Sequence, residues 1–439
     1  MSKATHRAYA AEFEAAKDGL PGRHLPWLEA LRARGLERFV EAGLPTIRDE
    51  TWKFTNLRAL ARDVYGLAPA RSNGLATGDL APHLPAGLDC HRLVFVNGRL
   101  RPDISDIGAL PEGVRLSGLA ALLDDDPDLA EEHLAGALAG DSPVALNAAF
   151  MADGAVLIIG PGVALERPVH LLFLAAGEDA PAASHPRNLI VAGPGSSATV
   201  IESYAGLGDG PYWTNVVTDI VVGRDAAVRH VKLQDEGVGA FHLAATRARL
   251  AEGASYDSFV AQTGARLARN EIAATLDGTG ADCRLSGVYL ARRRQHFDNT
   301  TVVDHAEPDG YSNEHYKGVL DDDAHGVFQG KIIVRADAQK TDAHQLNKNL
   351  LLSEGAQVDT KPELEINADD VQCSHGAATG KLDEEALFYM RARGIEAPEA
   401  QRMLVAAFVG EIVDTISPAP VKAHVERAVA AWLAAGGAS

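Results

Sequence analysis

Cysteine is scarce in this sequence, with only Cys90, Cys283 and Cys373 among 439 residues. Three thiols so widely spaced cannot form a disulfide framework, and the chain has neither a Cys-x-x-Cys nor a His-Glu-x-x-His motif. Low cysteine content fits a reducing compartment. The first residues, MSKATHRAYAAEFEAAKDG, are polar and lack the apolar block of a signal peptide. We therefore expect a cytoplasmic protein.

Long apolar runs and an excess of basic charge are also missing. No stretch approaches the ~20 apolar residues that a membrane-spanning helix needs. The formal net charge is −19, which disfavours nucleic acid and anionic membranes as partners because both attract basic surfaces. The sequence thus predicts a soluble protein that binds neither nucleic acid nor membrane.

Nucleotide-binding motifs are lacking as well. Two stretches, GVFQGKI (326–332) and GAATGKL (376–382), resemble a Walker A loop, which needs four residues between its glycines and Ser or Thr after the Lys. Both have three intervening residues, followed after the Lys by Ile332 or Leu382. The chain also has no dinucleotide fingerprint. We expect no ATP site in this chain.

Helical signals occur at both ends of the chain. Residues 1–65 carry an apolar stripe, and residues 116–140 predict a helix broken near Pro127, while LVFVNGRL (93–100) predicts two short strands around an Asn-Gly turn. Near the C-terminus, Asp383 predicts a helix N-cap and Gly394 the end of that helix. Two further helices are predicted by apolar residues at helical spacing, namely Leu404, Phe408 and Ile412, then Val421, Val425, Val429, Trp432 and Leu433.

The middle of the chain alternates short β-prone runs with turns. A turn followed by alanine recurs at Ala164, Ala198, Ala226, Ala254, Ala281, Ala324 and Ala356. Three successive separations are 28, 28 and 27 residues, whereas the next is 43. Near-equal spacing favours the stacked coils of a parallel β-helix, with a small residue where the chain bends. A β-sandwich is the alternative, although its turns usually recur every ~8–12 residues.

The predicted fold is therefore mainly β with helical flanks. We expect an N-terminal helical domain with a short strand pair over residues 1–144, a parallel β-helix core over 145–372 and a C-terminal helical domain over 373–439.

The stretch DDVQCSHGAATG (369–380) places Cys373 and His375 two positions apart. In an extended segment both side chains point to one side, so a thiolate and an imidazole could face one ion. Two ligands do not close a zinc site, which usually takes four. Either the pair is ordinary packing, or the missing ligands come from elsewhere, such as another chain at the end of the stack.

Carboxylates in the repeat region leave a second function open. DNTTVVDH (298–305) and LDDD (320–323) could supply an acid/base pair, as in β-helix enzymes that hydrolyse or cleave polysaccharides. Acids in turns are more often solvated loop residues or helix caps.

Several long stretches resemble the SufB/SufD family of iron–sulfur cluster assembly proteins. They include DNTTVVDH, SNEHYKGVL, LDEEALFYMRARGI and the segment GVFQGKIIVRADAQKTDAHQLNKNLLLSEGAQVDTKPELEINADDVQCSHGAATG; GLPTIRDETWKFTNL (43–57) is similar to a shorter N-terminal family motif. Within the family the chain is more similar to the SufD type, because it is shorter than the SufB type and has no N-terminal cysteine cluster. The resemblance implies a right-handed parallel β-helix flanked by helical domains.

The resemblance also implies partners and site residues. It implies a scaffold subunit rather than an enzyme, paired through its β-helix with a SufB-type paralogue and holding a SufC-type ABC ATPase with its C-terminal helices. His375 would help to bind iron or a transient iron–sulfur cluster at the paralogue interface, and the case for Cys373 is weaker. The region implicated in ATPase docking corresponds here to Leu387, Phe388, Tyr389, Arg391 and Arg393.

Overall fold

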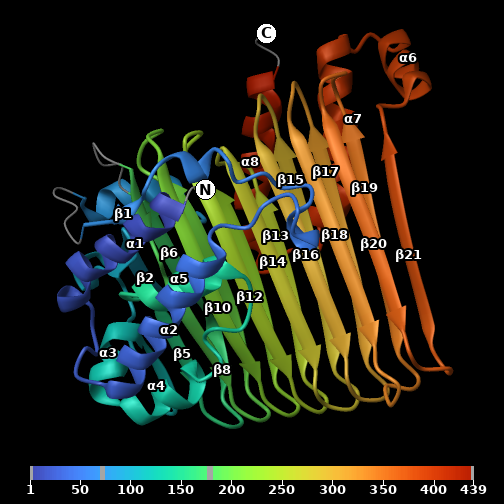
Figure 1. The fold of residues 1–439 in the computed structure, drawn as a ribbon. Helices are drawn as coiled ribbons and strands as arrows, with labels where there is room; N and C mark the ends of the chain where they lie inside the picture. The colour runs from blue at the N-terminus through green and yellow to red at the C-terminus, as the bar shows by residue number, and fades with distance from the viewer. Residues whose placement is uncertain (1–2, 70–74, 176–180, 437–439) are drawn as a thin grey trace.

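The computed structural model describes residues 3–69, 75–175 and 181–436. A long parallel β-helix runs through the molecule, with helices packed along its sides (Figure 1). The α-helices are α1 Lys3–Ala16, α2 Pro26–Ala42, α3 Leu119–Asp125, α4 Pro127–Leu134, α5 Ser142–Phe150, α6 Glu384–Ala392, α7 Ala397–Val413 and α8 Ala419–Ala435. Short 3-10 helices are η1 Lys17–Gly19, η2 Glu50–Trp52, η3 Leu60–Arg62, η4 Thr77–His83 and η5 Pro102–Ile104.

The strands form two sheets. They are β1 Gly66–Leu67, β2 His91–Val96, β3 Arg99–Leu100, β4 Val114–Gly118, β5 Ala155–Ile159, β6 Ala164–Ala175, β7 Ala182–Ser184, β8 Arg187–Ala192, β9 Ser197–Gly206, β10 Tyr212–Val222, β11 Ala227–Asp235, β12 Phe241–Leu250, β13 Ser255–Gln262, β14 Leu267–Leu276, β15 Asp282–Ala291, β16 His296–His305, β17 Tyr311–Leu320, β18 His325–Val334, β19 Asp342–Leu351, β20 Gln357–Ile366 and β21 Gln372–Gly380.

From β8 onward, successive strands alternate between the two sheets, so each coil of the β-helix contributes one strand to each sheet. Sheet I has the order β20-β18-β16-β14-β12-β10-β8-β5-β4, and sheet II the order β21-β19-β17-β15-β13-β11-β9-β6-β2-β3. From β5 and β6 onward these neighbours are parallel. The prediction of a parallel β-helix core is therefore confirmed, and the β-sandwich alternative is wrong.

The repeated alanines mark where the chain turns into the interior. Ala226, Ala254 and Ala281 precede strands of sheet II that pair in register, so they stack in one row, and all three are buried. Ala324 and Ala356 form the matching row beside sheet I. The separation of 43 residues between Ala281 and Ala324 arises because the two alanines belong to different rows, one beside each sheet.

Not every alanine in the predicted series belongs to these rows. By the register of β6, β9 and β11, the residue that stacks under Ala226 is Ser196. The first 28-residue separation is therefore coincidental, because Ala164 and Ala198 lie within their strands.

Helices cover the outer face of each sheet. The N-terminal helices pack aromatic side chains, including Tyr9 and Phe150, against Trp213 and Phe241 of sheet I. Helices α7 and α8 cover sheet II with a second apolar cluster formed by Val405, Val409, Ile412, Val413, Val421, Val425, Val429 and Trp432. Because helices pack on apolar side chains of both outer faces, many strands of this core are buried on both sides.

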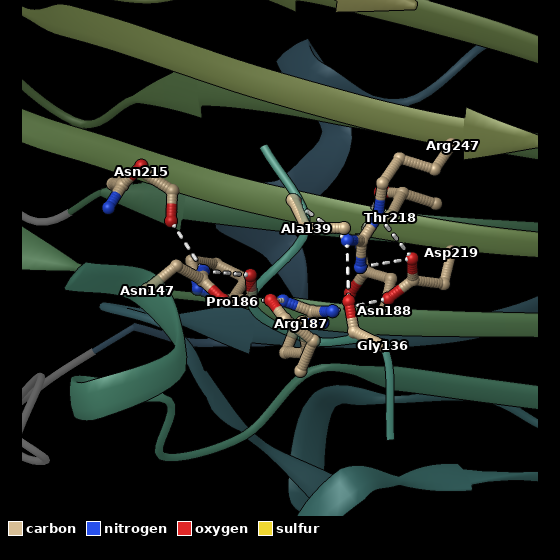
Figure 2. A network of polar contacts seen from close by, with 11 residues as sticks. Gly136, Ala139, Asn147, Pro186, Arg187, Asn188, Asn215, Thr218, Asp219 and Arg247 are labelled. Carbon is tan, nitrogen blue, oxygen red and sulfur yellow. Dashed lines mark hydrogen bonds and ion pairs between the residues drawn. The ribbon is translucent and has the colours of Figure 1, made fainter. Parts of the chain in front are cut away.

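A polar network fixes the N-terminal helices to the first coils (Figure 2). Arg187 of β8 is fully buried and pairs with Asp219 of β10 at 2.7 Å. Asp219 also pairs with Arg247 of β12, which donates to the carbonyls of Gly136 and Ala139 after α4. Burial lowers the pKa of Arg187 to about 10, so it remains charged. Arg187 and Arg247 thus share the carboxylate of Asp219, and Arg247 holds the loop of residues 136–139 in place.

The structure confirms the predicted hairpin and helix break in the N-terminal part and the predicted N-cap near the C-terminus. The predicted hairpin is β2 and β3, with positive φ at Asn97 and Gly98, and the helix break falls at Pro127. Asp383 caps α6 through the N–H groups of Glu385 and Ala386.

The predicted buried face of α7 is confirmed at Ile412, which is 1% exposed, but not at Leu404 and Phe408. Its fully buried residues include Val405 and Val409, whereas Leu404 and Phe408 are half-buried.

Across the described ranges, no helix is long and apolar enough to span a membrane. The three domain boundaries stay a prediction.

Candidate functional site at the end of the β-helix

The last coil consists of β20 and β21, and it forms one end of the stack (Figure 1). β21 is the final strand of sheet II and pairs with β19. Its side chains are half-buried or exposed along the whole strand, as are those of β20. An edge strand with free backbone groups is a template for pairing with another chain. This end of the β-helix is therefore a surface suited to a protein partner.

Cys373 and His375 lie on the same face of β21. Cys373 pairs in register with Ala343, and His375 with Gln345. Because Ala343 and Gln345 both point into the solenoid and are buried, Cys373 and His375 continue the inward-facing rows at the open end. Cys373 is half-buried against the apolar cluster around Ile332, whereas His375 is exposed. The predicted pair thus shares one face, with the imidazole within reach of a neighbouring molecule.

The electrostatics of the two side chains differ. Burial raises the pKa of the Cys373 thiol, and the carboxylate of Asp342 raises it further. The thiolate is the form that binds metal, and a raised pKa means that less of it is present at neutral pH. Among the described residues, no group of three His, Cys, Asp or Glu side chains is placed to hold a metal ion.

Two buried residues behind His375 were not foreseen. Glu314 of β17 and Gln345 of β19 occupy the two preceding places of the same inward-facing row. Both are almost fully buried, and burial raises the pKa of Glu314 to about 7. The coil length, which separates residues 314, 345 and 375 by about 30, was the signal that could have found them.

Helix α6 carries the residues predicted to dock an ATPase. Phe388 and Tyr389 are 73% and 60% exposed, the highest values among the large apolar side chains that the structure describes. Leu387 is half-buried, and Arg391 and Arg393 are exposed. Arg393 donates a 2.8 Å hydrogen bond to the Tyr389 hydroxyl and lies over its ring. Exposed aromatic residues beside arginines are the composition that protein interfaces favour.

Helix α7 is fixed to sheet II by one buried cation. Lys317 of β17 is fully buried on the outer face and donates 2.8 Å to the carbonyl of Phe408. It also pairs with Glu411, whose pKa this contact lowers. Since α6 packs on α7, this contact connects the exposed aromatic residues of α6 with β17, the strand that pairs with β19.

Carboxylates of the repeat region have structural partners. Asp298 pairs with the buried Arg269 and accepts from Thr300 at 2.9 Å. Asp304 pairs with Arg335 at 2.6 Å. Asp322 accepts from a backbone N–H of the adjacent turn, at Arg293. These roles do not favour the polysaccharide-cleaving alternative.

Both stretches that resemble a phosphate-binding loop lie in strands. Residues 326–332 belong to β18, and residues 376–380 belong to β21. An extended strand directs its N–H groups to its neighbours in the sheet, so it does not form the curled cradle that binds phosphate.

Comparisons with known proteins agree along the chain. Residues 173–408 match the family model described as SUF system FeS cluster assembly, SufBD core domain, and residues 3–171 match the SufBD protein N-terminal region. The chain is 33% identical to an iron–sulfur cluster assembly SufBD family protein of Synechocystis, over 88% of this chain and 87% of that protein. It is 32% identical to the iron–sulfur cluster assembly protein SufD of Escherichia coli, over 89% of each chain, and 27% identical to SufD of Bacillus subtilis, over 90% and 92%.

Proposed function

Because the chain belongs to the SufBD family of iron–sulfur cluster assembly proteins, we propose that it is a SufD-type scaffold subunit. In this proposal it pairs with a SufB-type paralogue, carries a SufC-type ATPase and has no catalytic step of its own. Iron or the nascent cluster is the cargo of the complex. Its resemblance to SufD proteins over almost the whole chain supports this assignment.

The uncovered last coil supports pairing with a paralogue. A second β-helix that adds a strand to β21 would continue the sheet and satisfy its free backbone groups. His375 would then lie at the seam, where the other chain adds the ligands that this one lacks. Iron accepts imidazole and thiolate ligands. A site divided between two chains would hold its cluster less firmly than four cysteines, which suits a scaffold that must release its product.

Helix α6 supports ATPase docking by its exposed Phe388 and Tyr389, flanked by arginines. In this account the ATPase moves the C-terminal helices, and Lys317 transmits that movement to sheet II. The movement rearranges the seam around His375.

The test of this proposal is assembly from three purified or co-expressed chains. This chain, a SufB-type paralogue and a SufC-type ATPase should form one complex in size-exclusion chromatography under anaerobic conditions, and the complex should bind iron and sulfide. Failure of this chain to associate with either partner would contradict the proposal. Polysaccharide cleavage by the isolated chain would support the alternative function instead.

A further inference from the structure

An inward-facing polar row leads from the interior of the β-helix to His375. Glu314, Gln345 and His375 are successive members of this row, on β17, β19 and β21. Glu314 has no exposed surface, and Gln345 is 2% exposed. Neighbouring members lie one strand spacing apart, about 4.8 Å. Such buried polar residues, in a core of alanine, aliphatic and aromatic side chains, need hydrogen-bond partners.

The first two members of the row hold each other in a fixed orientation. Gln345 donates through Nε2 to Glu314 Oε1 at 3.2 Å, and Thr301 from the opposite sheet donates to the other carboxylate oxygen. The amide nitrogen of Gln345 also fills the space beside Gly330, where a Cβ atom would lie 1.9 Å from it. The amide nitrogen of Gln345 is therefore directed toward Glu314, on the preceding coil. This bond fixes the plane of the amide and, with it, the position of the amide oxygen.

The oxygen of this amide lacks a donor. Gln345 Oε1 is buried and has no hydrogen-bond partner within the described part of the chain. A buried oxygen left in this state costs about 1–3 kcal/mol. The next side chain in the row is the imidazole of His375, and a neutral imidazole offers one N–H donor and one nitrogen lone pair.

We propose that Gln345, oriented by Glu314, is a positioning residue that accepts the Nδ1–H of His375 and leaves Nε2 free for iron at the open end of the coil. This inference rests on the proposed function of His375 and deepens it. The hydrogen bond on one ring nitrogen decides which nitrogen can bind a metal, and such partners commonly change metal affinity or activity 10- to 100-fold.

One competing group is present in the same coil. Thr360 of β20 has a buried hydroxyl oxygen without a hydrogen-bond partner in the described residues, so it is an alternative acceptor for the ring. The experiment must therefore compare Gln345 with Thr360. Asn347, one row further along β19, is an equally buried amide that bonds Tyr289 and serves as the control for general damage to the interior.

The test is the tautomer of His375 in the isolated full-length chain, read from long-range proton–nitrogen NMR correlations after labelling the histidines with nitrogen-15. A His375→Gln variant identifies the signal among the 16 histidines. We expect the wild type to hold its proton on Nδ1. Gln345→Leu should give a mixture of tautomers, and Gln345→Glu, which keeps an acceptor oxygen, should restore one tautomer. Asn347→Leu and Thr360→Val should leave the signal unchanged.

Two results would overturn the inference: a tautomer mixture in the wild type, which needs no variant to fold, or a shift caused by Thr360→Val but not by Gln345→Leu. In the assembled complex, Gln345→Leu should lower iron content about 10-fold. The NMR measurement requires neither metal nor partner. A fixed tautomer combined with normal cluster formation by a His375 variant would thus refute the proposed function while leaving the hydrogen bond established.

Discussion

Glu50 and Lys361 lie 311 positions apart in the sequence, yet Nζ of Lys361 donates to a carboxylate oxygen of Glu50 at 2.6 Å. Glu50 belongs to the segment of residues 44–57 that follows α2, and Lys361 to β20 of the last coil. This segment crosses sheet I, and Figure 1 shows it in blue over the yellow strands. Gln329 of β18 bonds its backbone at Thr51 on the way. The N-terminal part of the chain therefore reaches β20 of the last coil.

Trp52 anchors this segment and provides a first prediction. It is 3% exposed, donates to Asp141 at 2.5 Å and stacks against the Arg269 guanidinium at 4.1 Å. Trp52→Ala should lower the free energy of unfolding by about 3–5 kcal/mol, because a large side chain leaves a cavity. Hydrogen exchange should rise over residues 44–57. Lys361→Met removes the ion pair of β20 with Glu50 and should change stability little. Equal effects of both variants would contradict the anchoring role of Trp52.

Lys317 provides a second prediction, concerning the attachment of the C-terminal helices. Lys317→Met keeps most of the buried volume but removes the bonds to Glu411 and to the Phe408 carbonyl. The pair with the exposed Glu411 is screened by solvent and contributes little. A bond from a charged group to a buried carbonyl is worth about 1.5–3 kcal/mol. We therefore expect faster hydrogen exchange in α7 and a loss of about 2 kcal/mol in the free energy of unfolding.

The matched control is Lys422→Met, since Lys422 pairs with Asp414 and Glu426 at the surface. It should leave exchange in α7 unchanged. Protection of α7 that survives in the Lys317 variant would show that apolar packing alone holds these helices.

Phe388 provides a third prediction. Phe388→Asp replaces an exposed apolar side chain, so the isolated chain should keep its stability. Affinity for the ATPase, measured by calorimetry, should fall about 30-fold, as expected for an aromatic residue central to an interface. Val238→Asp changes a residue that is 49% exposed on the turn between β11 and β12. The Val238 variant should bind the ATPase with the affinity of the wild type. Wild-type affinity of the Phe388 variant would exclude α6 as the docking helix.

Glu314 provides a fourth prediction, in the pH dependence of stability. Burial raises its pKa from 4.5 to about 7, so the native state retains a proton that the unfolded state releases between these pH values. Its contribution to stability therefore falls as pH rises through this range. Glu314→Gln cannot ionise, so its stability relative to the wild type should increase by about 2–3 kcal/mol between pH 5 and pH 8 in denaturant titrations. A difference that does not depend on pH would contradict the raised pKa.

The sequence alone was sufficient for features that repeat or that depend on local chemistry. The row of Ala226, Ala254 and Ala281 exists because each coil needs a small residue at the same bend, and coil length is therefore visible in the spacing. Asp383 and the Asn97-Gly98 turn were predictable because caps and tight turns are decided by neighbouring residues.

Features that depend on long-range pairing were not predicted, although the spacing of about 30 residues per coil was a signal for Glu314 and Gln345. Glu314 and Gln345 resemble ordinary strand residues until the register places them under His375. Glu50 and Lys361 meet only because the segment of residues 44–57 crosses sheet I. Along α7 the sequence located Ile412 on the buried face, but packing against sheet II buries Val405 fully and leaves Leu404 half-buried.

Iron and sulfide content of the three-chain complex carrying His375→Ala is the most direct test of the central claim. The account predicts a complex that elutes intact but holds about 10-fold less iron and sulfide than the wild type after anaerobic reconstitution. His344→Ala, which alters an outward-facing histidine of β19 bonded to Ser374, should behave as the wild type. Full iron and sulfide content in the intact His375 variant would contradict the claim.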